Sequence, residues 1–195
     1  RGGGIEKHVE EIGKRLVAAG HHDVFVYGRR RYMEGAPTTV AGMHIIYLPT
    51  LYRKNLEAIV HTFFASVHAL FGAYDVIHYH GVGPSTLAWI PRAFLKHTRV
   101  VVTFHSQDRF HKKWSWFGRW YLYFGEWTAV HFPHACIAVS HVLQVFCRET
   151  FGREVVYIPN GATNQRTSKT DKLGSFGLEP GKYLLNVGRI VGHKG

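Results

Sequence analysis

The sequence has few cysteines, few acidic residues and no long uncharged apolar run. It contains 2 cysteines in 195 residues, and the spacing of Cys136 and Cys147 fits neither a disulfide scaffold nor a zinc motif. No uncharged apolar run reaches the length of about 18 residues that a membrane-spanning helix needs. The first four residues, Arg1 to Gly4, do not have the pattern of a signal peptide. We therefore expect a soluble globular protein of a reducing compartment, with a cytoplasmic location.

The shortage of acidic residues makes the chain strongly basic. It has 24 lysines and arginines against 13 aspartates and glutamates, a formal net charge of +11 and 15 histidines. This excess predicts an anionic partner, which is a nucleic acid, a phosphorylated small molecule or an anionic membrane surface.

Hydrophobic residues make up 46% of the chain, which excludes a disordered tail. The length is enough for one domain, or for one domain and a fragment of another.

Helical and strand patterns alternate along the first 160 residues. Ile5, Val9, Ile12 and Leu16 follow helical spacing, whereas residues 99–104 form a β-branched stretch typical of a buried strand. The sequence predicts further strands at 24–27, 44–48, 75–80, 135–139 and 155–158, a loop at 29–42, and further helices at 56–70, 85–96, 116–132 and 142–150. This order predicts an α/β fold, in which a Rossmann-like, mostly parallel sheet has helices on both faces.

Composition also predicts the domain organisation. Residues 1–160 are expected to form an N-terminal domain, residues 161–172 an interdomain linker, and residues 173–195 the first strand and loop of a truncated second domain. The new strand is expected at residues 183–187. A glycine-rich turn opens the first helix without a strand before it, so the first, central strand of the sheet is expected to be missing. Whether Lys182 to Gly188 fills that place is left open.

Two histidines stand at predicted strand ends, where open α/β sheets bind their ligands. His80 ends the strand at 75–80, and His105 follows the strand at 99–104, with Ser106 and Asp108 after it. This position favours them as site residues over the histidines in helical stretches, which are His8, His61, His68 and His97. Because no third ligand stands at a metal-binding spacing, we expect no metal.

Two further groups suit an anion. Gly3 and Gly4 adjoin the first helix, whose N-terminus offers free N–H groups to a phosphate. Arg189 and Lys194 follow the last predicted strand and suit a diphosphate. A flexible N-terminus and a solvated basic C-terminus are the alternative interpretations, and both stay open.

The segment from Lys112 to Trp127 combines basic and aromatic residues, including four tryptophans. Such a mixture suits a membrane interface or stacked nucleic-acid bases. Because the aromatic residues occur nearly all round the predicted helix, core packing is an equal alternative.

Taken in order, the motifs resemble the family-four retaining glycosyltransferases of the GT-B fold. The closest likeness is to the rhamnosyltransferase-like branch of bacterial surface-polysaccharide enzymes. The motifs are Gly3-Gly4-Ile5-Glu6, Gly20-His21, Asp75-Val76-Ile77-His78, Val102-Thr103-Phe104-His105, Ala138-Val139-Ser140, Ile158-Pro159-Asn160-Gly161, and Gly188-Arg189 with Lys194-Gly195. The resemblance implies an acceptor-side N-terminal domain and a C-terminal domain that binds most of a nucleotide-diphosphate sugar.

The resemblance also implies roles for the donor-side residues. Gly3 and Gly4 would place backbone N–H groups near the donor's diphosphate, and Arg189 and Lys194 would neutralise it as it leaves. His105 would be the catalytic residue at the reaction centre. No metal or other cofactor is required in this pattern.

On the acceptor side, the resemblance implies that His80, Ser106 and Asp108 face a saccharide or a lipid-linked saccharide. The implied location is the cytoplasm, with peripheral contact at the inner, anionic face of the cytoplasmic membrane. Because most of the second domain is absent, we expect this chain to be weak or inactive alone. The alternative is a basic module that binds nucleic acid or an anionic membrane without catalysis. A nicotinamide-dependent enzyme is disfavoured, because the third glycine and the acidic ribose ligand are absent.

Overall fold

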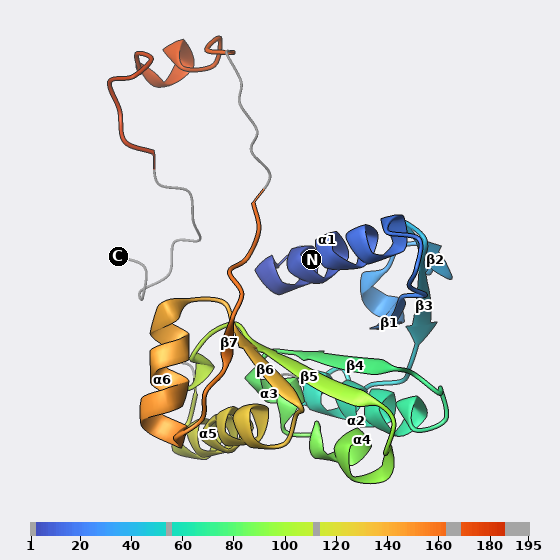
Figure 1. Ribbon diagram of the computed structural model, residues 1–195. Helices are drawn as coiled ribbons and strands as arrows, with labels where there is room; N and C mark the ends of the chain where they lie inside the picture. The colour runs from blue at the N-terminus through green and yellow to red at the C-terminus, as the bar shows by residue number, and fades with distance from the viewer. Residues whose placement is uncertain (1–2, 54–55, 111–113, 163–168, 186–195) are drawn as a thin grey trace. The chain divides into compact units, whose positions relative to one another are not determined.

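The computed structural model describes residues 3–53, 56–110, 114–162 and 169–185 (Figure 1). The chain divides into two compact units, Arg1–Asn160 and Gly161–Gly195. The elements of the first unit are α1 Gly4–Ala18, β1 Phe25–Gly28, η1 Arg30–Tyr32, β2 Thr39–Val40, β3 Met43–Tyr47, α2 Glu57–Ala69, β4 Val76–His80, α3 Val82–Ser85, α4 Trp89–Phe94, β5 Arg99–Phe104, η2 Asp108–Phe110, α5 Trp116–His131, β6 Ala135–Ala138, α6 His141–Phe151 and β7 Val156–Tyr157. In the second unit, the described residues form the short helix η3, Gly174–Phe176.

The first unit contains a parallel four-stranded sheet in the order β4-β5-β6-β7. A second sheet has the order β1-β3-β2, in which β1 and β3 are parallel and β2 is antiparallel to β3. Helices α2, α3 and α5 lie together on one face of the four-stranded sheet, and α1 lies on the opposite side (Figure 1). The predicted α/β class, with a Rossmann-like parallel sheet between helices, is therefore confirmed.

The two sheets end on β1 and β4, which each have one strand partner among the described residues. The sequence left open whether Lys182 to Gly188 takes a place in the sheet. Of the segment considered for that place, Lys182 to Leu185 form no strand, and residues 186–188 lie outside the described part of the chain. The strand predicted at 183–187 is thus wrong for its first three residues, 183–185.

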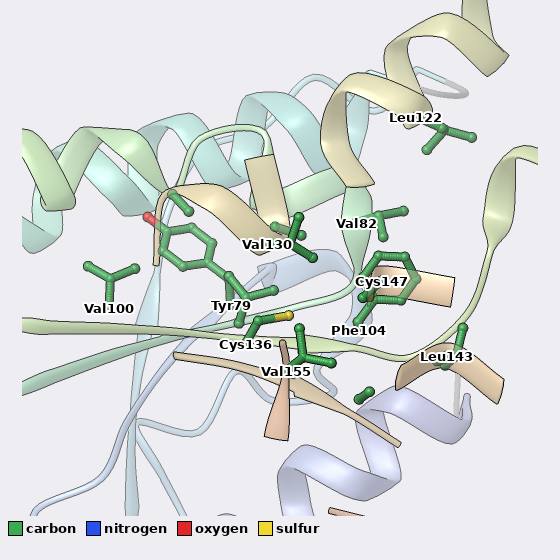
Figure 2. Close-up of a cluster of buried hydrophobic side chains, with 14 residues drawn as sticks. Tyr79, Val82, Val100, Phe104, Leu122, Val130, Cys136, Leu143, Cys147 and Val155 are labelled. Carbon is green, nitrogen blue, oxygen red and sulfur yellow. The ribbon is translucent and has the colours of Figure 1, made fainter. Parts of the chain in front are cut away.

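The core of the first unit is built on β5. Val100, Val102 and Phe104 are fully buried, which agrees with the apolar character of a strand covered on both faces. They form a cluster with residues of the neighbouring strands and of α5 and α6, among them Tyr79, Leu122, Val130, Cys136, Leu143, Cys147 and Val155 (Figure 2). Burying a side chain as large as Phe104 contributes about 2–3 kcal/mol. This packing fixes the end of β5, from which His105 follows.

Two local predictions need correction. The helix predicted at 85–96 is two short helices, α3 and α4, because Pro91 has no N–H to continue a helical ladder through this segment. The loop predicted at 29–42 contains η1 and the two-residue strand β2, which is too short to leave a periodic pattern in the sequence.

The turn between β4 and α3 needs Gly81, whose φ of +88° is unfavourable for other residues.

Helix α5 turns most of its aromatic side chains away from the core. It buries Leu122, Ala129 and Val130 against the sheet, and exposes an aromatic face of Trp116, Phe117, Trp120, Tyr123, Phe124 and Trp127. Along this face, Trp120 and Phe124 stack with an angle of 10° between their rings. The aromatic face therefore does not pack in the core of the described structure. Among the described residues, no helix has the length and apolar character needed to cross a membrane.

Candidate functional site

Three histidines from three separate elements meet at the carboxyl ends of β4 and β5. His80 is the last residue of β4, His105 directly follows β5, and His8 lies in the second turn of α1. The Nδ1 atom of His80 and the Nε2 atom of His105 are 3.2 Å apart, so one of them donates a hydrogen bond to the other. The His8 ring stands edge-on to both, at centroid distances of 5.6 Å from His80 and 4.9 Å from His105. We call His8, His80 and His105 the histidine cluster.

Burial keeps the histidine cluster neutral. It is the main reason that the pKa of His80 is lowered to about 2 and that of His105 to about 4, and neighbouring imidazoles contribute to both shifts. The Asp108 carboxylate acts in the opposite direction on the pKa of His105. Burial also lowers the pKa of His8. At pH 7 each ring therefore has one N–H donor and one nitrogen lone pair.

The sequence correctly pointed to the positions of His80 and His105 at strand ends, but it ranked His8 as an ordinary helical histidine. His8 does lie in a helix, but its ring contacts both of the other rings, which the sequence did not predict. A signal was present, because His8 lies on the same side of α1 as Ile5 and Ile12, the side that packs on the unit. The sequence showed no third ligand at a metal-binding spacing along the chain, but in space one ring nitrogen from each of the three histidines lies within 4.8 Å of the others.

The segment after β5 is held against α5. Ser106 donates a hydrogen bond from Oγ to Oδ1 of Asp108, at 2.8 Å. The next residue, Arg109, places its Nε 2.9 Å from Oε2 of Glu126, a fully buried residue of α5. The guanidinium of Arg109 also lies over the ring of Tyr123, 4.9 Å from the ring centroid. These contacts position Ser106 and Asp108 beside His105, at the edge where the sequence predicted acceptor-side residues.

The two glycines at the N-terminus are where the sequence predicted them. Gly3 is the N-cap of α1 and Gly4 its first residue. The Ile5 side chain lies 3.8 Å from the position of a Cβ built on Gly81, so this end of α1 is near the end of β4. The carboxylate of Glu6 folds back against Gly3 and places a negative charge at the helix N-terminus. An anionic ligand at this point would have to displace it.

The remaining predicted site residues, Arg189 and Lys194, lie outside the described residues, as do Lys112 and Lys113 of the basic aromatic segment.

A second feature lies on the outer side of α5 and η2. There, Arg109, Phe110, Arg119, Trp120 and Tyr123 line an open hollow of about 350 Å³. Two guanidinium groups beside aromatic rings suit a ligand that has both a negative charge and an apolar or saccharide surface.

Comparisons with known proteins agree with this architecture. The family model described as Glycosyltransferase Family 4 matches residues 2–166, which is most of the chain. Among solved structures, the fold is similar to that of a sucrose-phosphate synthase from Thermosynechococcus elongatus, with a TM-score of 0.56 and 18% sequence identity over 83% of this chain and 87% of that chain. At that identity the likeness shows the fold alone, which is that of a GT-B N-terminal domain.

No curated protein sequence matches the chain significantly. Neither the family match nor the structural match supports the alternative of a non-catalytic basic module. The family model spans the histidine cluster, the glycines at the start of α1 and the segment after β5. The chain therefore belongs to Glycosyltransferase Family 4.

Proposed function

We propose that the chain is the acceptor-side part of a retaining glycosyltransferase, which transfers a hexosyl group from a nucleotide-diphosphate sugar to a saccharide or a lipid-linked saccharide. The main support is the position of His105, which directly follows β5 in a domain of Glycosyltransferase Family 4. Open α/β sheets bind their ligands at this edge. We further propose that the protein belongs to the rhamnosyltransferase-like branch that builds bacterial surface polysaccharides.

In this proposal, His105 is the catalytic residue beside the transferred sugar. Positive charge develops on a sugar ring as its bond to the leaving group breaks. A neutral imidazole does not repel that charge, and it still donates or accepts one hydrogen bond with a sugar hydroxyl. The burial that lowers the pKa of His105 to about 4 therefore suits this role.

The leaving diphosphate is proposed to meet backbone N–H groups at Gly3 and Gly4. A helix N-terminus provides unpaired N–H groups and the positive end of the helix dipole. Binding then requires the Glu6 side chain to move away from Gly3, which a side chain at the exposed end of a helix can do. Arg189 and Lys194 are proposed to supply the cations that stabilise the leaving group, and no metal is needed for this step.

On the acceptor side, the hollow beside Arg109 and Arg119 suits the phosphate groups of a lipid-linked saccharide. The adjoining aromatic face of α5 suits the headgroup region of a membrane, where tryptophan is favoured. We therefore propose that the acceptor is used at the inner, anionic surface of the cytoplasmic membrane.

The transfer reaction is tested by incubating the chain with a panel of nucleotide-diphosphate sugars and a polyprenyl-diphosphate saccharide, and measuring release of the nucleoside diphosphate. We expect slow release of the nucleoside diphosphate with one donor. His105→Asn should lower the rate at least 100-fold, whereas His141→Asn, outside the histidine cluster, should not. Equal rates for His105→Asn and the unmodified chain with a donor that is turned over would contradict the proposal.

The membrane contact is tested by sedimentation with phosphatidylcholine vesicles, with and without phosphatidylglycerol. We expect the chain to sediment with the anionic vesicles, and the double variant Trp116→Ala/Trp120→Ala to lose most of this binding. The matched control is Phe71→Ala, which removes an exposed aromatic ring that follows α2. Equal sedimentation of all three proteins with both vesicles would contradict a membrane contact through α5.

A further inference from the structure

We propose that the histidine cluster is a binding site for a zinc-class divalent transition-metal ion, with His8, His80 and His105 as its three protein ligands. The inference rests on the positions of these side chains and does not depend on the proposed transfer reaction. Each of the three residues offers one ring nitrogen, and these atoms all lie within 4.8 Å of one another.

The distances are close to those of a tetrahedral site. With Zn–N bonds of about 2.0–2.1 Å, tetrahedral geometry places two ligand nitrogens about 3.3–3.4 Å apart. His80 Nδ1 and His105 Nε2 are already 3.2 Å apart. The ring of His8 stands nearly perpendicular to that of His105, at 84°, so it approaches the pair from the side of α1. The ring nitrogen of His8 lies within 4.8 Å of those of His80 and His105, so it is within reach of an ion held by the pair.

The surroundings favour a cation of this class. The three ligands come from α1, β4 and the end of β5, so the packing of the unit holds them in place before a metal binds. A histidine binds a metal ion through the lone pair of its neutral ring. The Asp108 carboxylate lies near enough to His105 to influence it electrostatically and would offset part of the charge of a bound cation.

The ligand set also indicates which metals bind. Imidazole nitrogens suit Zn²⁺, Co²⁺, Ni²⁺ and Cu²⁺, whereas Mg²⁺ and Ca²⁺ prefer oxygen ligands. Three histidines leave one position of a tetrahedral ion for a water molecule or a substrate oxygen. The nearby His78 is less suited to be a fourth ligand, since its Nε2 lies 2.8 Å from Oγ1 of Thr103.

The experiment titrates the metal-free chain with Zn²⁺ by calorimetry and with Co²⁺ by visible absorption, with Mg²⁺ as a control ion. We expect one Zn²⁺ per chain at the tightest site, and a Co²⁺ spectrum of tetrahedral intensity. His8→Gln and His80→Gln should each weaken this site at least tenfold. The matched control His22→Gln removes an exposed histidine outside the cluster and should leave the site unchanged.

Because the chain has 15 histidines, weak binding elsewhere is expected, and only the difference between variants identifies the site. Far-UV circular dichroism of each variant checks that it folds, and His8→Gln is the most informative because it alters a surface helix rather than the sheet. Equal Zn²⁺ affinity for His8→Gln and the unmodified chain would overturn the inference. A weak octahedral Co²⁺ spectrum that is the same in all variants would also overturn it.

Discussion

Replacing Glu126 with glutamine removes a carboxyl group that α5 buries completely while keeping the shape of the side chain. Burial raises the pKa of Glu126 to about 7, and the nearby Arg109 guanidinium offsets only part of this effect. Neither carboxylate oxygen accepts a well-formed hydrogen bond from the described residues. Meanwhile, the Arg109 cation is stabilised by aromatic rings as well, with Phe110 and Tyr123 both within 5 Å.

The raised pKa of Glu126 makes the free energy of unfolding change with pH in one direction. Between the ordinary pKa of 4.5 and the raised pKa of about 7, folded Glu126 keeps a proton that the unfolded chain has released. The free energy of unfolding therefore falls as the pH rises through this window. The full difference corresponds to about 3 kcal/mol, and most of it lies between pH 5 and pH 8.

The assay is urea unfolding of the unmodified chain and of Glu126→Gln at several pH values from 5 to 8, followed by far-UV circular dichroism. Glutamine has no proton to release, so the stability of the unmodified chain relative to the variant should decline by about 2–3 kcal/mol over this range. The variant serves as its own control for every other titrating group. A difference between the two proteins that stays constant with pH would refute the reasoning and show that Glu126 is ionised throughout.

Two further predictions concern packing and helix capping. A Cβ at Gly125 would collide with the carbonyl oxygen of Val82, so Gly125→Ala should lower the free energy of unfolding by about 1–3 kcal/mol in urea titrations, and a change below 0.5 kcal/mol would contradict this close approach of α5 and α3. The Ser140 hydroxyl accepts a hydrogen bond from the Leu143 N–H at the start of α6, so Ser140→Ala should cost about 1 kcal/mol, whereas Ser140→Asp should keep most of the stability. Equal stability of the serine and alanine proteins would show that this cap contributes nothing.

The sequence determined the elements whose signals are local. The β-branched run at 99–104 predicted β5 with its observed bounds, and Ser140 marked the start of α6 because a cap acts over three residues. The alternation of strands and helices predicted the α/β class, and the motif order predicted the family. Strand ends can be read in the same way, which is why His80 and His105 were placed correctly at the edge of the sheet.

Tertiary structure decided which of these residues meet. Only the packing of α1 against the first unit brings His8 to His105, because the two are far apart along the chain and no local pattern links them. Packing likewise decided that α5 buries Glu126 and exposes Trp116, although the sequence of α5 has aromatic residues on nearly every side. The sequence by itself therefore determined the fold and the kind of chemistry expected. The tertiary structure decided the composition of the site, because a site depends on distances between elements that are set only when the core is packed.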